Sequence, residues 1–272
     1  MTTINLKNWM SQVSDEKTID QLLIPGTHDT MTGPCDLKYY KTQNLSLAEQ
    51  LEVGVRFLDL RIRRSLMAAH REWLSDASVT DIFGCIKQFL QENSTEVMIL
   101  RVQNANEKKD DFPEYGEAIK EALAPYFDFF YLPNEEKAWP KLGQCRGKAI
   151  VFECAPPELK VNYRQGKQWA FNWHGNDAVV IQDLWDGPSV TDKLSAIEKN
   201  LADSLKADGK LYLNHISATN GEIGNPDGYA EKINPAVQEK FAELKSSEYR
   251  GVQIYDFVDD KLSKVVIKVN FL

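Results

Sequence analysis

Seven short runs of apolar and β-branched residues recur along this chain, and segments with helical spacing separate several of them. Runs of this length and composition predict strands of a sheet. Parallel strands need crossover connections, usually helices, and both faces of such a sheet must be covered. The alternation therefore favours a single α/β fold, a (β/α) barrel of the TIM type, distorted or incompletely closed, over a doubly wound sheet. The runs fall at residues 21–25, 55–62, 96–103, 148–153, 178–183, 211–217 and 251–257.

Helical spacing of apolar residues is clearest at 82–90 and 190–201, and each stripe predicts a helix packed against the strands. A similar stripe at 262–269 predicts a last helix. Asn234-Pro235 combines a capping residue with a proline suited to a first helical turn, which predicts that a helix begins there. The phosphate-binding fingerprints GxGxxG and GxxxxGK(S/T) are absent, which argues against a nucleotide-binding fold.

Length and charge limit the class of protein. The chain has 272 residues, 43% of them hydrophobic, which is enough for one large core. No linker or repeat divides it, so we expect a single domain over residues 1–272. Its 40 acidic and 32 basic residues give a net charge of −8. This balance argues against nucleic acid as a partner and against simple electrostatic docking on anionic membranes.

Targeting signals and cysteine chemistry are not evident. The segment MTTINLKNWM lacks the basic and apolar regions of a secretory signal peptide, and no stretch of about 18 apolar residues occurs. We therefore expect a soluble, unanchored chain. The scattered cysteines lack the spacing of a zinc site and the density of a disulfide scaffold, so we expect free thiols at Cys35, Cys85, Cys145 and Cys154.

Polar residues lie at or near the ends of several runs, where the strands of a barrel reach its catalytic face. A histidine, an arginine and several carboxylates from separate strands suit phosphoryl transfer. That reaction needs a base for the attacking hydroxyl, a fixed cation for the phosphate oxygens and an acid for the leaving group, and this set requires no metal. The residues are Thr27, His28, Asp29, Asp59, Arg61, Arg63, Gln103, Asp183, Asn214, Ser217 and Asp256.

Two sequence segments that contain several of these polar residues are specific enough to indicate a family. LLIPGTHDT, followed about 30 residues later by GVRFLDLRIR, resembles the X-domain signature of bacterial phosphatidylinositol-specific phospholipase C, a member of the PLC-like phosphodiesterase superfamily. The similarity continues in order through AHREW, RGKAIVFE, VVIQDLW, YLNHIS, GYAEKINPAV and VQIYDFVDDK, and so covers nearly the whole chain.

The resemblance implies that His28 is the general base that deprotonates the inositol 2-hydroxyl, with Asp256 orienting its imidazole. The products would be diacylglycerol and inositol 1,2-cyclic phosphate, from phosphatidylinositol or its glycosylated form. His70 would protonate the departing diacylglycerol oxygen. The family commonly has a paired histidine followed by Gly-Pro here, whereas Ala69 precedes His70 and Arg71 follows it.

Arg61 would contact the phosphate, and Asp29 would hold Arg61 and assist the acid. Asp59 lies two residues before Arg61 and on the same strand face, which makes it part of this polar cluster. The calcium-dependent branch of the superfamily has Asn after the first histidine and an acidic residue in place of Arg61. A guanidinium in that place supplies the positive charge, so we expect no metal or other cofactor.

On the substrate side, Asp183 matches the family's carboxylate that binds inositol hydroxyls, and Trp185 matches the aromatic under the sugar ring. Two positions depart from the family, which usually has Arg and Lys where this chain has Cys154 and Gln103. We expect Gln103 to contact the head group all the same. The other histidines, His174 and His215, match no catalytic position and are expected to be structural.

Partners and location follow from the same resemblance. It implies an inositol phospholipid substrate and transient contact with a membrane surface, for which Tyr39, Tyr40 and Trp73 are candidates. We expect a monomer that does not bind nucleic acid. The substrate suggests a secreted protein, although the sequence contains no signal peptide.

Two other functions stay open. AAHREW is similar to the opening of metal-dependent glycerophosphodiesterase-like barrels, but His70 lies far along the chain for that role and no Glu-x-Asp metal pair is evident. A non-catalytic barrel that binds inositol phosphate or lipid is the second alternative, suggested by the altered head-group positions. The reactive side chains at all five predicted catalytic positions favour an enzyme.

Overall fold

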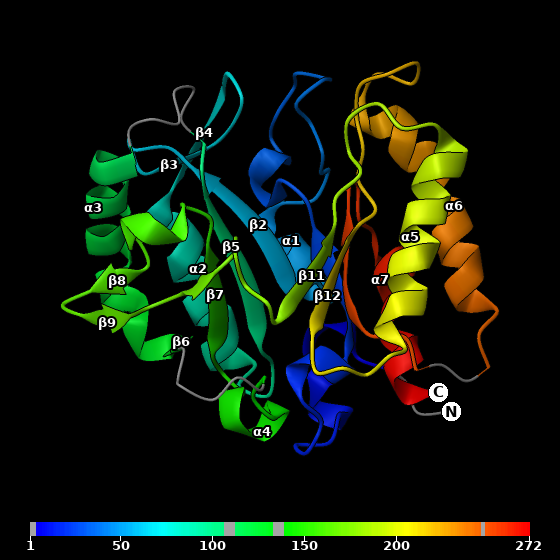
Figure 1. Cartoon of the computed structure of the whole chain (residues 1–272), viewed down its shortest axis with the longest axis horizontal. Helices are drawn as coiled ribbons and strands as arrows, with labels where there is room; N and C mark the ends of the chain where they lie inside the picture. The colour runs from blue at the N-terminus through cyan, green and yellow to red at the C-terminus, as the bar shows by residue number, and fades with distance from the viewer. Residues whose placement is uncertain (1–3, 106–111, 133–138, 246–247) are drawn as a thin grey trace.

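The computed structural model describes residues 4–105, 112–132, 139–245 and 248–272, and a curled parallel sheet forms its centre (Figure 1). The strands along this curl are β1 (Leu23–Thr27), β2 (Phe57–Ile62), β5 (Met98–Asn104), β7 (Ala149–Glu153), β10 (Phe171–Asn172), β11 (Val179–Gln182), β12 (Leu211–His215) and β13 (Gly251–Tyr255). Their order is β10-β7-β5-β2-β1-β13-β12-β11, and each neighbouring pair is parallel. All strands except β10 coincide with the predicted runs, so the α/β barrel architecture is confirmed.

The curl does not close into a complete barrel. β10 and β11 are neighbours in sequence but lie at opposite ends of the strand order, and no ladder joins them in the described part of the chain. Side chains bridge this seam instead. Asn176 Nδ2 donates to the Asn172 carbonyl oxygen at 2.9 Å, and Asn176 Oδ1 accepts from the Ala178 N–H at 3.0 Å. Trp139 Nε1 donates to the Ala178 carbonyl oxygen at 3.3 Å.

Helices cover the outer face of the curl. They are α1 (Leu47–Glu52), α2 (Val79–Glu92), α3 (Phe112–Leu123), α5 (Val190–Ser204), α6 (Pro226–Ala242) and α7 (Asp260–Lys268). The short α4 (Leu142–Cys145) lies instead beside the amino-terminal segment, below the sheet in Figure 1. Short 3-10 helices occur at Leu6–Gln12, Ile19–Gln21, Thr30–Thr32, Ala124–Phe129, Pro157–Leu159 and Val269–Phe271. In Figure 1, α2 and α3 lie on the flank of β5 and β7, and α5 and α6 lie on the opposite flank beyond β12. Within the described ranges, no helix is long and apolar enough to cross a bilayer.

Serine caps begin the two helices that the clearest stripes predict. At the start of α2, Ser78 Oγ accepts from the Asp81 N–H at 3.2 Å, and Asp81 accepts in return from the Ser78 N–H at 2.9 Å. At the start of α5, Ser189 Oγ accepts from the Asp192 N–H at 3.1 Å. Both predicted helices are confirmed, as is the helix predicted at 262–269, which is α7.

The helix start predicted at Asn234-Pro235 is wrong, because α6 begins earlier, at Pro226, and Pro235 lies inside it. Pro226 already occupies the first turn, where a proline loses no intrahelical hydrogen bond. Asn234 has a different task. Its Nδ2 donates to the Asp256 carbonyl oxygen at 2.8 Å and so ties α6 to the residue that follows β13.

A hairpin that the apolar pattern did not predict extends the sheet from β2. Its strands pair antiparallel with each other, and Ile62 of β2 pairs with Ala68 of the first. The turn places Arg71 at a φ of +51°, directly after His70. The strands of this hairpin are β3 (Met67–His70) and β4 (Trp73–Ser78), and further short strands are β6 (Phe130–Tyr131), β8 (Tyr163–Arg164) and β9 (Lys167–Gln168).

Alternation along the strands separates an inner apolar layer from an outer one. The outer layer packs against the helices and includes Leu23, Leu58, Leu100 and Val151. The inner layer fills the barrel and includes Ile24, Phe57, Ile99, Ile150, Phe152 and Val252. Beyond Phe57 and Ile99, the inner positions of β2 and β5 are Asp59, Arg61, Arg101 and Gln103. The barrel interior therefore changes from apolar to polar toward the carboxyl ends of its strands.

A buried ion pair closes the opposite end of the barrel. Arg56 Nε lies 2.9 Å from Glu96 Oε2, and both side chains are fully buried where β2 and β5 begin. Glu96 Oε1 also accepts from the Met10 N–H at 3.1 Å. The amino-terminal segment is thereby fastened under the sheet, and the amino end of the barrel is sealed.

Candidate active site

A cavity of about 340 Å³ opens at the carboxyl ends of the strands, where ligands of α/β barrels bind. Two other hollows are larger, about 470 and about 570 Å³, but neither has a histidine among its described lining residues. The smaller cavity is lined by His28, Tyr39, Arg61, His70, Arg71, Arg101, Gln103, Asp183, Trp185, His215, Ser217, Ala218, Thr219, Pro226 and Asp256. Seven of the nine residues to which the resemblance assigns a catalytic or substrate-binding role are in this set, and the other two, Asp29 and Asp59, lie buried behind it. The further strand-end candidates Thr27, Arg63 and Asn214 are not among its lining residues.

His28 and Asp256 face each other because they follow two paired strands. Thr27 of β1 is in register with Tyr255 of β13, so the next residue of each strand points into the barrel. His28 Nδ1 lies 2.8 Å from Asp256 Oδ1. The main chain at His28 is held as well, since its carbonyl oxygen accepts from Gln43 Nε2 at 2.9 Å. The imidazole therefore presents Nε2 to the cavity in a fixed orientation.

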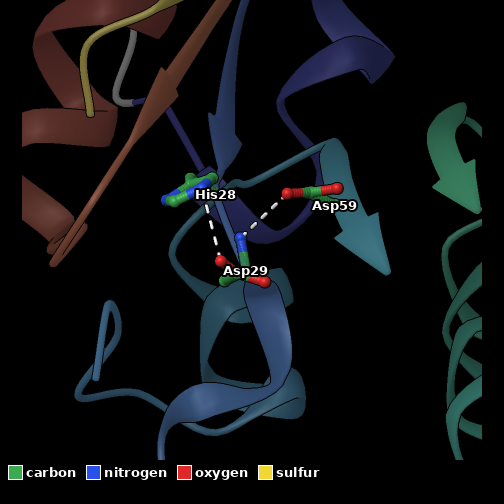
Figure 2. A group of neighbouring side chains, drawn as sticks. All are labelled: His28, Asp29 and Asp59. Atoms are coloured by element: carbon green, nitrogen blue, oxygen red, sulfur yellow. Dashed lines mark hydrogen bonds and ion pairs between the residues drawn. The ribbon is translucent and has the colours of Figure 1, made fainter. Parts of the chain in front are cut away.

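Arg61 lies at the centre of a cluster of buried side chains. Its Nε is 2.6 Å from Asp29 Oδ1, and its Nη2 is 3.1 Å from Asp59 Oδ2. The same Nη2 is 2.7 Å from His28 Nε2, a distance that suits donation to an unprotonated ring nitrogen. The Asp29 N–H in turn donates to Asp59 Oδ2 at 3.2 Å (Figure 2). One guanidinium thus contacts the predicted base and both acidic residues.

Asp29 adopts a left-handed backbone conformation, with φ +42° and ψ +56°. Few residues other than glycine tolerate this region, although aspartate is among the better tolerated. The turn places one carboxylate oxygen of Asp29 3.3 Å from His28 Nε2, the contact drawn in Figure 2. Local strain at this residue therefore helps to bring its side chain to Arg61.

His28, Asp29 and Asp59 form a group whose ligand atoms lie within 4.8 Å of one another, a spacing that a metal ion can use. In this chain, each of the three contacts the guanidinium of Arg61. The charge of the cluster is balanced further by Arg101, whose Nη1 lies 3.3 Å from Asp59 Oδ1. These residues therefore fit an arginine-centred site, with the guanidinium where a cation would bind.

His70 enters from the unpredicted hairpin and lies across the cavity from the base. Its ring centroid is 6.3 Å from that of His28. His70 Nδ1 lies 2.7 Å from the Tyr40 carbonyl oxygen, and Nε2 lies 3.1 Å from Asp29 Oδ2. The Tyr40 carbonyl oxygen is a hydrogen-bond acceptor, which fixes a hydrogen on Nδ1, and the nearby Asp29 carboxylate favours a positive charge on the ring although its contact with Nε2 does not have hydrogen-bond geometry. Such a group can supply a proton to a leaving group.

Burial and neighbouring charges set the protonation states of the cluster. Burial, reinforced by Arg61, lowers the pKa of His28 well below its usual value, so the imidazole is neutral at pH 7. Burial and the Asp29 charge raise the pKa of Asp256. Burial also raises the pKa of Asp59, but the positive charges of Arg61 and Arg101 outweigh burial and hold this pKa below its usual range. A neutral His28 has the free lone pair that a general base requires.

Three of the predicted substrate-binding residues, Gln103, Asp183 and Trp185, also line the cavity. Asp183 and Trp185 lie on the loop after β11, and Trp185 is 41% exposed. The buried Lys193 of α5 donates from Nζ to the Leu184 carbonyl oxygen at 2.8 Å and so anchors this loop. Gln103 faces the cavity from β5, and its Oε1 is buried without a partner among the described residues.

Arg101 and His215 line the cavity although neither was predicted as a site residue. The signal for Arg101 was its inner position on β5, two residues before Gln103. Its Nε lies 3.4 Å from Cys154 Sγ, and its guanidinium carbon lies 4.3 Å from the centre of the Trp173 ring. The Arg101 guanidinium therefore lies beside Cys154, the position at which the family that this chain resembles usually has an arginine. His174, in contrast, lies outside the cavity lining.

Several known proteins are similar to this chain in sequence, in architecture or in both. The family described as PI-PLC X 1 matches residues 16–150. A 1-phosphatidylinositol phosphodiesterase from Listeria monocytogenes is 34% identical, over 98% of this chain and 86% of the relative. One from Staphylococcus aureus is 27% identical, over 96% of this chain and 93% of the relative.

A solved phosphatidylinositol-specific phospholipase C from Listeria monocytogenes superposes with a TM-score of 0.89. The superposition covers 98% of this chain and 99% of that one, at 31% sequence identity. Such extensive coverage leaves no large part of either chain outside the shared fold. The signature around His28, the order of the strands and the match along the whole chain agree, and this chain belongs to the phosphatidylinositol-specific phospholipase C family.

Proposed function

We propose that this chain cleaves phosphatidylinositol into diacylglycerol and inositol 1,2-cyclic phosphate. The observation that carries the proposal is the contact of Arg61 with His28 and Asp29 at one cavity, with His70 on the far side of Asp29. These groups supply the base, the cation and the acid of a phosphoryl transfer. The similar proteins named as phosphatidylinositol phosphodiesterases support the same substrate class.

His28 begins the reaction by taking the proton of the inositol 2-hydroxyl on Nε2. In the free enzyme, this nitrogen accepts from Arg61 Nη2 at 2.7 Å. A bound phosphate competes for the Arg61 donors, and Nε2 is then available to the hydroxyl. Asp256, 2.8 Å from Nδ1, holds the ring and stabilises the imidazolium that forms.

The attacking oxygen forms a bond to phosphorus while the bond from phosphorus to the glycerol oxygen breaks. Arg61 stabilises the negative charge on the phosphate oxygens, and its side chain keeps 21% exposure toward the cavity for this contact. His70 donates its Nε2 proton to the departing diacylglycerol oxygen. Asp29 lies 2.6 Å from Arg61 and 3.1 Å from His70, so one carboxylate positions both the cation and the acid.

The rim of the cavity suits contact with a lipid surface. Tyr39 lines the cavity and is 65% exposed, and Leu37 beside it is 46% exposed. Both also line the adjoining hollow of about 570 Å³. Exposed apolar side chains around a ligand site favour insertion among lipid head groups. We propose that this rim meets the membrane while phosphatidylinositol enters the site.

Phosphorus NMR of a phosphatidylinositol digest tests the proposed reaction. Inositol 1,2-cyclic phosphate should form before any acyclic inositol phosphate, because the nucleophile belongs to the substrate and is held beside phosphorus. A substrate with a methylated 2-hydroxyl should not react. Acyclic phosphate as the sole product from the earliest time points would instead indicate direct attack by water.

Activity should persist in excess chelator, because the Arg61 guanidinium already contacts each member of the potential metal-binding group. Arg61→Lys should lower kcat by roughly a hundredfold or more, since an ammonium cannot reproduce the planar fork. Initial rates with and without EDTA give the first result, and Arg164→Lys on β8 is the matched control. Loss of activity in EDTA that calcium restores would contradict this account.

The two histidines should respond differently to the leaving group. His28→Ala should abolish turnover of every substrate, because the 2-hydroxyl must lose its proton whichever group departs. His70→Ala should lose on the order of a hundredfold on phosphatidylinositol, but recover much of this on a thiolate or nitrophenolate analogue that leaves unprotonated. His174→Ala, outside the cavity lining, is the control. Equal losses of His70→Ala on both substrates would exclude it as the acid and make Asp29 the next residue to test.

Leu37→Ser should weaken binding to phosphatidylinositol-containing vesicles roughly tenfold, as expected for one partly inserted leucine. Its turnover of a soluble inositol phosphodiester should be unchanged. Leu205→Ser is the matched control, because Leu205 is 43% exposed and lies after α5, near the amino end of β12. Vesicle sedimentation measures both variants, and equal effects would show that the rim has no special role.

A further inference from the structure

His215 is a buried residue of the cavity to which the proposed mechanism gives no part. It ends β12 at an inner position, two residues beyond Leu213, and only 1% of it is exposed to solvent. Its ring lies edge-on to that of His28, with the centroids 6.0 Å apart. The side chain therefore forms part of the wall beside the base.

The two nitrogens of His215 have different surroundings. Nδ1 lies 3.5 Å from Ser217 Oγ and 3.8 Å from Asp183 Oδ1. Nε2 is buried, and no group in the described ranges forms a hydrogen bond with it. Buried polar atoms nearly always have a partner, and leaving one without costs free energy. An orphan nitrogen in a cavity wall indicates a ligand atom at that place.

Burial lowers the pKa of His215 to about 4, although the Asp183 charge acts in the opposite direction. The positive charges of Arg101 and Lys193 also favour the neutral ring. A neutral imidazole has one N–H and one lone pair. The Asp183 carboxylate can only accept, so we assign the hydrogen to Nδ1, where it faces this carboxylate and the Ser217 hydroxyl, and Nε2 is left as an acceptor.

We propose that His215 binds the substrate head group, with Nε2 accepting a hydrogen bond from an inositol hydroxyl other than the 2-hydroxyl. This inference rests on the proposed function and adds a residue to it. His28 and His215 lie close enough for one inositol ring to place its 2-hydroxyl at the first and another hydroxyl at the second. Asp183 then has two tasks, since it faces the cavity and also fixes the tautomer of His215.

The neutral acceptor suits a hydroxyl better than a ring phosphate. A hydroxyl has a proton to donate to Nε2, whereas an ionised phosphate presents only acceptor oxygens. Gln103 Oε1 is a second buried acceptor in the same cavity, likewise without a partner among the residues described. Two such acceptors match a polyol, because each hydroxyl can donate to one of them.

Three substitutions separate the two nitrogens. The amide of His215→Gln reaches the place of Nε2, the amide of His215→Asn reaches only that of Nδ1, and His215→Leu has neither. We expect kcat/KM to fall roughly tenfold for the leucine and asparagine variants. For the glutamine variant we expect a fall of less than about fivefold. His174→Leu is the control outside the cavity lining and should match the wild type.

Substrates that lack one hydroxyl each provide the decisive measurement. Soluble inositol phosphodiesters deoxygenated in turn at carbons 3, 4, 5 and 6 are cleaved by the wild type and by His215→Leu. At one position, loss of the hydroxyl should lower kcat/KM of the wild type roughly tenfold but should not lower kcat/KM of His215→Leu any further. The two changes remove the same interaction, so their effects are not additive. Equal losses in both proteins at every position would overturn the inference. A uniform loss with a shifted pH profile would overturn it too, since His215 would then act through His28.

Failure of this inference can be distinguished from failure of the proposed function. Turnover of phosphatidylinositol by the wild type tests the function alone. Binding of myo-inositol, followed by proton NMR line broadening, tests His215 even without turnover and should weaken in His215→Leu but not in His174→Leu. If His215→Leu does not fold, the contrast between the soluble glutamine and asparagine variants gives the answer. Equal activity of those two would contradict a role for Nε2.

Discussion

The position of the Arg61 guanidinium is the constraint on which this site depends. Two carboxylates, Asp29 and Asp59, are buried at the open end of a barrel where unpaired charges would be very unfavourable. Arg61 contacts both and also reaches His28. The left-handed turn at Asp29 is needed to complete this arrangement. Removal of the guanidinium would therefore leave its partners buried without compensation, in addition to removing a phosphate contact.

Two buried carboxyl groups of the site, those of Asp59 and Asp256, differ in how readily they ionise. Asp59, between Arg61 and Arg101, stays ionised, whereas burial and a like charge oppose ionisation of Asp256. Both lie on top of an apolar inner layer that keeps water from beneath the cluster. The rigidity of paired parallel strands sets the spacing, since His28 and Asp256 follow residues in direct register. Reactivity here results from strand register and from the local charge balance together.

Much of this arrangement could be predicted from sequence, because the core strands are apolar runs and the polar residues of the site lie at their ends. The hairpin of β3 and β4 was missed, since alternation is weak there, and α6 was placed too late because Asn234-Pro235 imitates a helix start. His215 was expected to be structural because it matched no catalytic position of the family, although its segment YLNHIS is part of the resemblance. Only the order of the strands in the curled sheet, in which β13 pairs with both β1 and β12, brings His215 beside His28. The roles of the individual residues remain predictions for kinetics to test.

The seam between β10 and β11 has a consequence for how the barrel tolerates substitutions. Main-chain ladders are insensitive to most substitutions, but this seam depends on the side chains of Asn176 and Trp139. Single substitutions can therefore alter how far apart the two edges lie without disturbing any strand pair. The seam lies in the same wall as the loop that carries Asp183 and Trp185, which follows β11 directly. A substitution at Asn176 or Trp139, remote from the reacting atoms, can thus shift the wall that carries this loop.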